Sequence, residues 1–182
     1  MSGGHGGHVD PHNKEIALLI SILALVLAVS ETLGKSAQTS ALSYNIEASN
    51  LWAFYQSKTI RRTVLRTAAQ EMAVHADSPK AKEQIADWKK TAERYQNEPD
   101  TGEGRDQLEA RAKAAEKKRD LARQAYHHFE VSSAAVQIAI VLASASIITS
   151  IPALAWTAVA LGAASVFFCV IGVWFPTAIH LF

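Results

Sequence analysis

Apolar and polar residues are strongly segregated along this chain of 182 residues. Three stretches are almost wholly apolar: 16–33, 131–151 and 153–175. They contain one charged residue between them, Glu31. Because a helix needs about 20 apolar residues to cross the hydrocarbon core of a membrane, we predict three transmembrane helices, the first extended to 14–34. Pro152 suits the first turn of a helix and ends the preceding one, so the last two helices should form a tight hairpin.

The region between the first two apolar stretches, 35–130, is rich in charged residues and follows a helical period. It holds all but one of the 18 Lys and Arg residues. With only 9 Gly and 5 Pro in the whole chain, a strand-rich and turn-rich fold is excluded, and we predict an all-α protein. The ends, 1–13 and 176–182, are predicted to be tails, the first of them flexible. The formal net charge of +1 indicates no nucleic-acid partner.

The distribution of Lys and Arg predicts the orientation of the membrane helices. Six of these residues lie within 111–130, just before the second apolar stretch, and the turn at Pro152 has none. Cytoplasmic flanks of membrane helices are enriched in such residues, which places the middle region in the cytoplasm and the N-terminus outside. The competing interpretation of 16–33 is a signal peptide. The acidic Asp10 and a single basic residue before this stretch argue against it.

Within 35–130, apolar and small residues recur at spacings of three and four. One such stripe consists of Leu51, Tyr55, Lys58, Arg62, Leu65, Ala69, Met72 and Ala76. A second stripe starts near Arg105 and continues into the second apolar stretch, which predicts one unbroken helix from there to Ile151. The stripes are narrow and rich in Ala, as in the seams of coiled coils. We therefore predict a helical, coiled-coil-like cytoplasmic insert.

Two breaks containing Pro, at 77–79 and 98–104, divide this insert. Helices over 36–76, 79–97 and 105–130 would measure about 60, 28 and 39 Å. The two shorter helices would therefore fit end to end along the long one. The basic and acidic residues then brought together are Lys58, Arg61, Arg62 and Arg66, and Glu98, Asp100, Glu103 and Asp106.

The rival arrangement pairs 79–97 with 105–123 as an antiparallel hairpin and leaves 36–76 lying on the membrane surface. A surface helix must separate apolar from charged residues. On a helical wheel, however, Tyr55 falls on the same side as Lys58 and Arg62, which favours the stacked arrangement.

The segment after the first apolar stretch combines aromatic and basic residues: Trp52, Phe54, Tyr55, Lys58, Arg61 and Arg62. We predict that it is an interaction surface inside the cytoplasmic insert rather than a membrane anchor. Its aromatic residues are expected near Tyr126 or a partner protein, and its bases near the acidic break.

Two sequence blocks resemble a known family. NLWAFYQSKTIRR follows the first apolar stretch, and YHHFEVSSAAVQIAIVLASASIIT leads into the second. In order and spacing they resemble the bacterial family catalogued as domain of unknown function 4337. This resemblance implies an inner-membrane protein with three spans and a helical cytosolic insert, and it assigns no catalytic or binding residue.

Histidines supply two candidate sites. His5, His8 and His12 in the Gly-rich N-terminal tail have donors and spacings that suit Zn, Cu or Ni, with a flexible polar tail as the alternative. His127 and His128 lie where the second span begins. They are candidates for a pH-sensing or intersubunit metal site, or for the polar end of an aromatic belt.

Glu31 is a candidate proton or ion site because it is the ionisable residue within an apolar stretch. The alternative is a carboxylate at the membrane edge that pairs with Lys35, four residues later on the same helix face.

Small residues line the second and third spans. The pairs Ala139–Ala143 and Ala160–Ala164 have the four-residue spacing that lets membrane helices approach closely. We predict a non-enzymatic membrane protein without a cofactor, in contact with lipid, that forms homo-oligomers or joins other membrane subunits. A transport-type or channel-type oligomer and a metal-responsive accessory protein remain alternatives.

Overall fold

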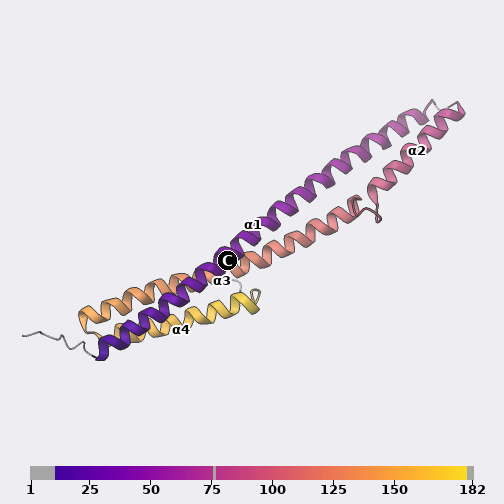
Figure 1. Cartoon of the computed structure of the whole chain (residues 1–182). Helices are drawn as coiled ribbons and strands as arrows, with labels where there is room; N and C mark the ends of the chain where they lie inside the picture. Colours follow the sequence, from indigo (N-terminus) through magenta and orange to yellow (C-terminus); the bar gives the residue numbers. More distant parts are fainter. Residues whose placement is uncertain (1–10, 76, 180–182) are drawn as a thin grey trace, which may run out of the picture. The chain divides into compact units, whose positions relative to one another are not determined.

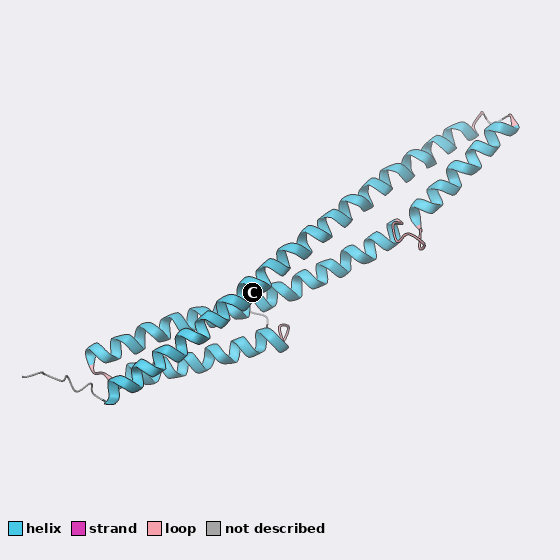
Figure 2. Ribbon diagram, viewed as in Figure 1, coloured by secondary structure: helices cyan, strands magenta, loops and turns pink. Residues whose placement is uncertain are grey.

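The computed structural model describes residues 11–75 and 77–179, without the side chains of residues 11 and 12. These residues form α-helices joined by short turns, and no strand occurs among them (Figure 2). The helices are α1 (Pro11–Ala73), α2 (Pro79–Gln96), α3 (Arg105–Thr149) and α4 (Pro152–Trp174). The predicted all-α fold is confirmed. The helix from Arg105 begins at the predicted residue and ends two residues before the predicted end.

Three of the described helices are long and apolar enough to cross a membrane. They are α1, α3 and α4, and each contains one of the three predicted apolar stretches. The first two also extend far beyond those stretches, because no Pro or other strong break interrupts either helix.

The chain divides into two compact units. Unit 1 comprises Met1–Ser40 and Leu121–Phe182, and unit 2 comprises Ala41–Asp120. In unit 1, the first part of α1 packs with the last part of α3 and with α4. The buried apolar residues of this core are Ile16, Leu23, Val136, Ala139, Ala143 and Ala158. Small residues on α3 and α4 bring the three helices into close contact.

In unit 2, α2 and the first part of α3 follow one another along the same side of α1 (Figure 1). The first part of α3 packs on α1 through Ala48, Leu51, Leu108, Ala112 and Ala115. A groove whose walls are formed by α1 and α2 shows that these two helices are also neighbours. The stacked arrangement is therefore present within unit 2, and the antiparallel pairing of α2 with α3 is not.

Local sequence determines where these helices stop and start. The hydroxyl of Ser78 accepts a hydrogen bond from the backbone N–H of Ala81, so it caps the N-terminus of α2, and Pro79 follows at the first helical position. Between α3 and α4, Ser150 adopts a left-handed conformation with φ of 55°, which ends α3 before Pro152 begins the next helix.

Candidate functional site

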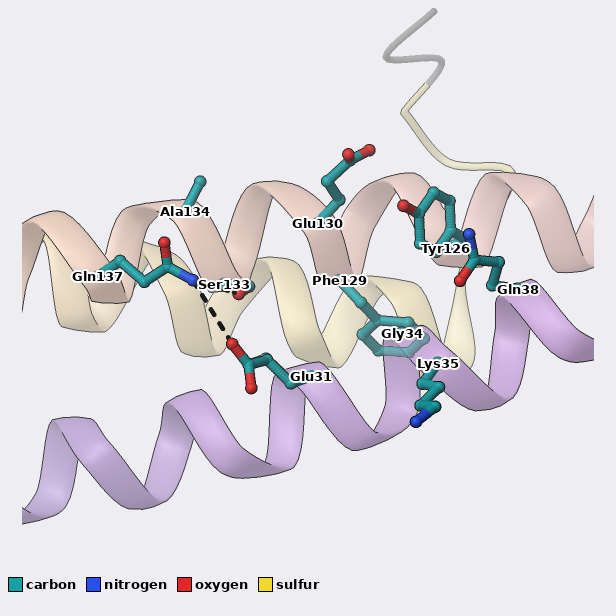
Figure 3. Close-up of a pocket in the computed structure, with 11 residues that line it drawn as sticks. Glu31, Gly34, Lys35, Gln38, Tyr126, Phe129, Glu130, Ser133, Ala134 and Gln137 are labelled. Carbon is teal, nitrogen blue, oxygen red and sulfur yellow. Dashed lines mark hydrogen bonds between the residues drawn. The ribbon is translucent and has the colours of Figure 1, made fainter.

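A groove in unit 1 contains the ionisable residue of the first apolar stretch, Glu31 (Figure 3). Its volume is about 450 Å³, and its walls come from α1 and α3. Within it, the side-chain amide of Gln137 donates a hydrogen bond of 3.5 Å to Glu31 Oε1 and one of 3.3 Å to the hydroxyl of Ser133. The long distance to the carboxylate indicates a weak, exposed contact.

Lys35 was the expected partner of Glu31, but the two side chains do not pair. Among the ion pairs of the described residues, none joins these two side chains. Figure 3 shows Glu31 reaching toward Gln137 on α3, whereas Lys35 extends away from it. A neutral amide on the neighbouring helix therefore takes the place of the predicted cation on the same helix.

Ser30, one of the residues lining this groove, meets serines from two other helices in the core of unit 1. Ser30 of α1, Ser132 of α3 and Ser165 of α4 are all fully buried. The hydroxyl of Ser132 lies 2.9 Å from that of Ser30 and 2.7 Å from that of Ser165. The thiol of Cys169 lies 3.5 Å from the Ser30 hydroxyl. A buried hydroxyl without a partner is costly, so this network fixes how the three helices are rotated against one another.

The two adjacent histidines have different surroundings. His128 is fully buried, and its Nε2 lies 3.1 Å from the carbonyl oxygen of Pro176. Since a carbonyl only accepts, Nε2 carries a proton and donates it. His127 is half-buried, with Nδ1 3.5 Å from Glu130. His128 is thus enclosed by its own chain and is not available for the predicted metal site between subunits.

In unit 2, Lys58 lies on α1, and its side chain is buried, with only 7% of it exposed. Its Nζ lies 3.2 Å from Glu98 and 3.8 Å from Glu103, both in the break between α2 and α3. The rings of Phe54 and Tyr95 lie close by, with centroids 5.4 and 5.1 Å from the nitrogen. Two carboxylates and two ring faces thus compensate for burial of the charge. The predicted meeting of this lysine with the acidic break is confirmed.

Arg105, the first residue of α3, forms a second polar junction in unit 2. Its guanidinium donates to Thr59 Oγ1 at 2.8 Å and to Tyr55 Oη and Gln96 Oε1 at 2.6 Å each. These partners lie on α1 and α2, so one side chain ties three helices together. From the sequence, Arg105 was predicted only as a helix start. The hydrogen-bonding groups around it are common residue types without a distinctive spacing.

The remaining predicted interaction residues of this region separate into two groups. The aromatic residues form the first group. Trp52 donates a hydrogen bond from Nε1 to Glu116 at 2.9 Å, and all three aromatic side chains, Trp52, Phe54 and Tyr55, pack against the buried apolar cluster between α1 and α3. Tyr126, which was expected beside them, belongs to unit 1.

The basic residues after Lys58 do not join its acidic partners. Arg61 is exposed. Arg62 and Arg66 line a groove between α1 and α2 with Lys89 and Glu93. Among the ion pairs of the described residues, those with Glu98 or Glu103 come from Lys58 and Arg94 alone. Lys58 is therefore the one of the four predicted bases that the structure places at the break.

The two predicted small-residue pairs of the apolar helices differ in how deeply they are buried. Ala139 and Ala143 are fully buried in unit 1, as close helix packing requires. On α4, however, Ala160 is exposed and Ala164 is half-buried. The face of α4 turned to the other helices instead carries Ala158, Gly162, Ser165, Ile171 and Gly172. The pair on α4 therefore lies away from the packed face of that helix.

The predicted metal site remains untested. His5 and His8 lie outside the described residues, and the structure does not describe the side chain of His12. Among the described residues, no group of three or more His, Cys, Asp or Glu side chains is placed to hold a metal ion.

These observations define an all-α protein with three helices able to cross a membrane and a second helical unit rich in charge. A family model described as "Domain of unknown function (DUF4337)" matches residues 12–175, and the chain belongs to this family. No curated protein and no solved structure matches the chain.

Proposed function

We propose that this chain is a non-enzymatic membrane protein that self-associates, with unit 1 in the bilayer and unit 2 in water. The observation that supports it most is the surface of unit 1. Large apolar side chains are exposed on all three of its helices: Leu18, Leu25, Val141, Ile148, Trp156, Phe167 and Trp174. Soluble monomers rarely expose an apolar surface of this extent, whereas lipid chains would solvate it.

The distribution of polar groups agrees with this assignment. In unit 1 the buried hydroxyls of Ser30, Ser132 and Ser165 satisfy one another. Exposed hydroxyls, such as those of Thr32 and Thr157, donate instead to the carbonyl four residues earlier in their own helix. In hydrocarbon no water is present to satisfy such groups, so a lipid-embedded bundle must pair them internally. Unit 2 has the pattern of a water-soluble bundle, with Ala and Leu inside and most of its charged residues exposed.

The proposed orientation rests on basic residues. Arg111, Lys113, Lys117 and Lys118 precede the second apolar stretch, and the turn at 150–151 has no base. The positive-inside rule then puts unit 2 in the cytoplasm and the N-terminus outside. The sequence resemblance implies a bacterial protein, and the proposed membrane is then the inner membrane.

Self-association is proposed over transport because the ionisable residues of the groove at Glu31 do not pair with one another. Lys35 and Glu130 also line the groove, but among the ion pairs of the described residues none joins Glu31, Lys35 and Glu130, and Glu31 contacts the Gln137 amide. Transport pathways use several such groups that pair with one another. Flux of small ions through reconstituted protein, abolished by Glu31→Gln and kept by Glu109→Gln, a carboxylate of unit 2 outside this groove, would favour the transport alternative.

The mass of the purified full-length protein in detergent and in lipid nanodiscs tests the proposal. We expect one homo-oligomeric species, a dimer or larger, that persists on dilution. A monomeric mass in both media would contradict self-association. Resistance to alkaline extraction from membranes, measured on the same preparation, tests the membrane assignment separately.

A further inference from the structure

We propose that the outer face of α1 in unit 2 is a parallel coiled-coil interface with a second copy of this chain. The inference rests on the proposed self-association and specifies the surface that carries it. It starts from exposed apolar side chains on α1 that no other part of unit 2 covers. Among them, Leu42 is 60% exposed and Ile60 65%, and Val74, in the turn directly after α1, is 75% exposed.

These residues follow a heptad. The first core positions are occupied by Ile46, Ala53, Ile60, Thr67 and Val74, and the second by Leu42, Ser49, Gln56, Thr63 and Gln70. All ten are exposed in the structure. The first positions are mainly apolar and the second mainly small or neutral polar. None is charged, although six charged residues lie within 41–73, the same part of α1. A seven-residue repeat free of charge over about 42 Å of helix, from Leu42 to Gln70, fits a coiled-coil seam whose first positions supply most of the apolar contact.

This seam lies opposite the face that packs on α2 and α3. Each first-position residue stands two places from a residue of the inner face, as Ile60 does from Lys58 and Thr67 from Ala69. Two residues correspond to about 200° around a helix. Because Lys58 and Ala69 are buried within unit 2, the seam points away from the helices that bury them.

The residue types favour two parallel strands. Four of the five first positions carry a β-branched residue, which is the preference of parallel dimers at this position. The flanking charges agree: Arg66 and Glu71 occupy flanking positions five residues apart. In a parallel dimer these two positions face each other across the interface, so each chain would offer a cation to the other's carboxylate.

The membrane spans would impose the same direction. When every copy enters the bilayer in one orientation, the part of α1 after Ser40 leaves the membrane on the same side in each copy. Two such helices meet in parallel and in register, which removes much of the entropy cost of association. The neutral polar residues at the second positions contribute little apolar contact. The reduced entropy cost of association offsets this weakness for two chains held in the same membrane.

Disulfide cross-linking of the full-length protein in membranes tests the interface, in a background carrying Cys169→Ala. We expect Ile46→Cys, Ile60→Cys and Val74→Cys each to cross-link with itself, because facing first-position residues lie within disulfide distance. Arg61→Cys, one residue from Ile60 but off the seam, is the matched control and should cross-link about tenfold less. Cross-linking of Ile46→Cys to Val74→Cys, without either self-pair, would indicate an antiparallel pair and overturn the proposal.

Charge exchange provides a second readout that does not depend on cysteine chemistry. Arg66→Glu and Glu71→Arg should each lower the dimer fraction measured by mass, and the double variant should restore it. Ile60→Asp should weaken the dimer about tenfold or more, since each chain buries one Ile at the seam. If the wild type is oligomeric and Ile60→Asp leaves its mass unchanged, the seam is wrong although self-association stands. If the wild type is monomeric, both proposals fail.

Discussion

Unit 1 stabilises its interior with neutral hydroxyls, whereas unit 2 uses full charges. In unit 1, the fully buried hydroxyls of Ser30 and Ser165 both contact the hydroxyl of Ser132. In unit 2, Lys58 is buried but its partner Glu103 keeps half of its side chain exposed. The same helix, α1, supplies Ser30 to one network and Lys58 to the other.

The difference follows from the medium proposed for each unit. In water, a cation can be buried while its carboxylate partners stay partly hydrated. The free-energy cost of removing the charges from water then remains moderate. In lipid that route is closed, and a hydroxyl that bonds a neighbouring hydroxyl is the less costly way to place a polar group. We therefore expect substitutions at the charged network of unit 2 to lower the free energy of unfolding more than substitutions at the serine network of unit 1.

Lys58→Met should destabilise unit 2 by about 2–3 kcal/mol, because Glu98 and Glu103 would lose the cation between them. Hydrogen exchange of the full-length protein in nanodiscs, read at peptides of unit 2, measures this loss. Lys113→Met, which removes an exposed lysine from an ion pair within α3, is the control and should leave exchange unchanged. Equal effects of the two substitutions would contradict the account of the buried lysine.

Gly104→Ala should destabilise the break between α2 and α3 by about 1–3 kcal/mol. An added Cβ there would clash with the backbone nitrogen of Glu98, the residue whose carboxylate pairs with Lys58, so this part of the break would have to shift. Gly102→Ala is the matched change in the same loop. It meets no neighbouring atom, and its cost should be limited to the strain of φ at +70°. Thermal unfolding of both variants should rank Gly104→Ala as the more harmful.

Ser132→Ala should cost about 1 kcal/mol or less, although Ser132 is the central member of the serine network. Hydrogen bonds between membrane helices contribute little because alternative partners exist in the unfolded bundle. Steric trapping or unfolding in mixed micelles measures it, with Ser144→Ala as control, since that hydroxyl bonds only within its own helix. A loss as large as that of Lys58→Met would show that the two networks do not differ as proposed.

The smallest effect concerns Glu109 and Lys113, whose side chains lie 2.6 Å apart on the surface of α3. The hydrogen bond and charge of Lys113 lower the pKa of Glu109. A carboxylate with a lowered pKa stabilises the folded state above its unfolded pKa, and this contribution disappears as the pH falls through the folded pKa. Lys113→Met should therefore alter the acid side of the pH–stability profile slightly and leave neutral pH unaffected.

Much of the fold followed from the sequence because long helices leave strong signals. The apolar stretches, the Pro-containing breaks and the start of α3 at Arg105 were all predictable. The position of Lys58 at the acidic break followed from helix lengths and charge alone, since rise per residue converts sequence distance directly into height.

The helix rotations were not predictable from the sequence. Ala160 and Ala164 were chosen for their spacing, but α4 is small on several faces, and Ala158 and Gly162 form the packed one. The serine network depends on those rotations and therefore had no signal of its own. Likewise, Lys35 is the local partner that spacing suggests for Glu31, whereas Gln137 comes from another helix.

The central claim is that the two units face different solvents, and labelling with a water-soluble maleimide tests it most directly. In a Cys169→Ala background, Leu25→Cys in unit 1 and Lys117→Cys in unit 2 both place a thiol at an exposed position. In intact membranes opened to reagent on both sides, we predict rapid labelling at position 117 and none at position 25, with both labelled after denaturation. Equal labelling of the two thiols in membranes would contradict the account.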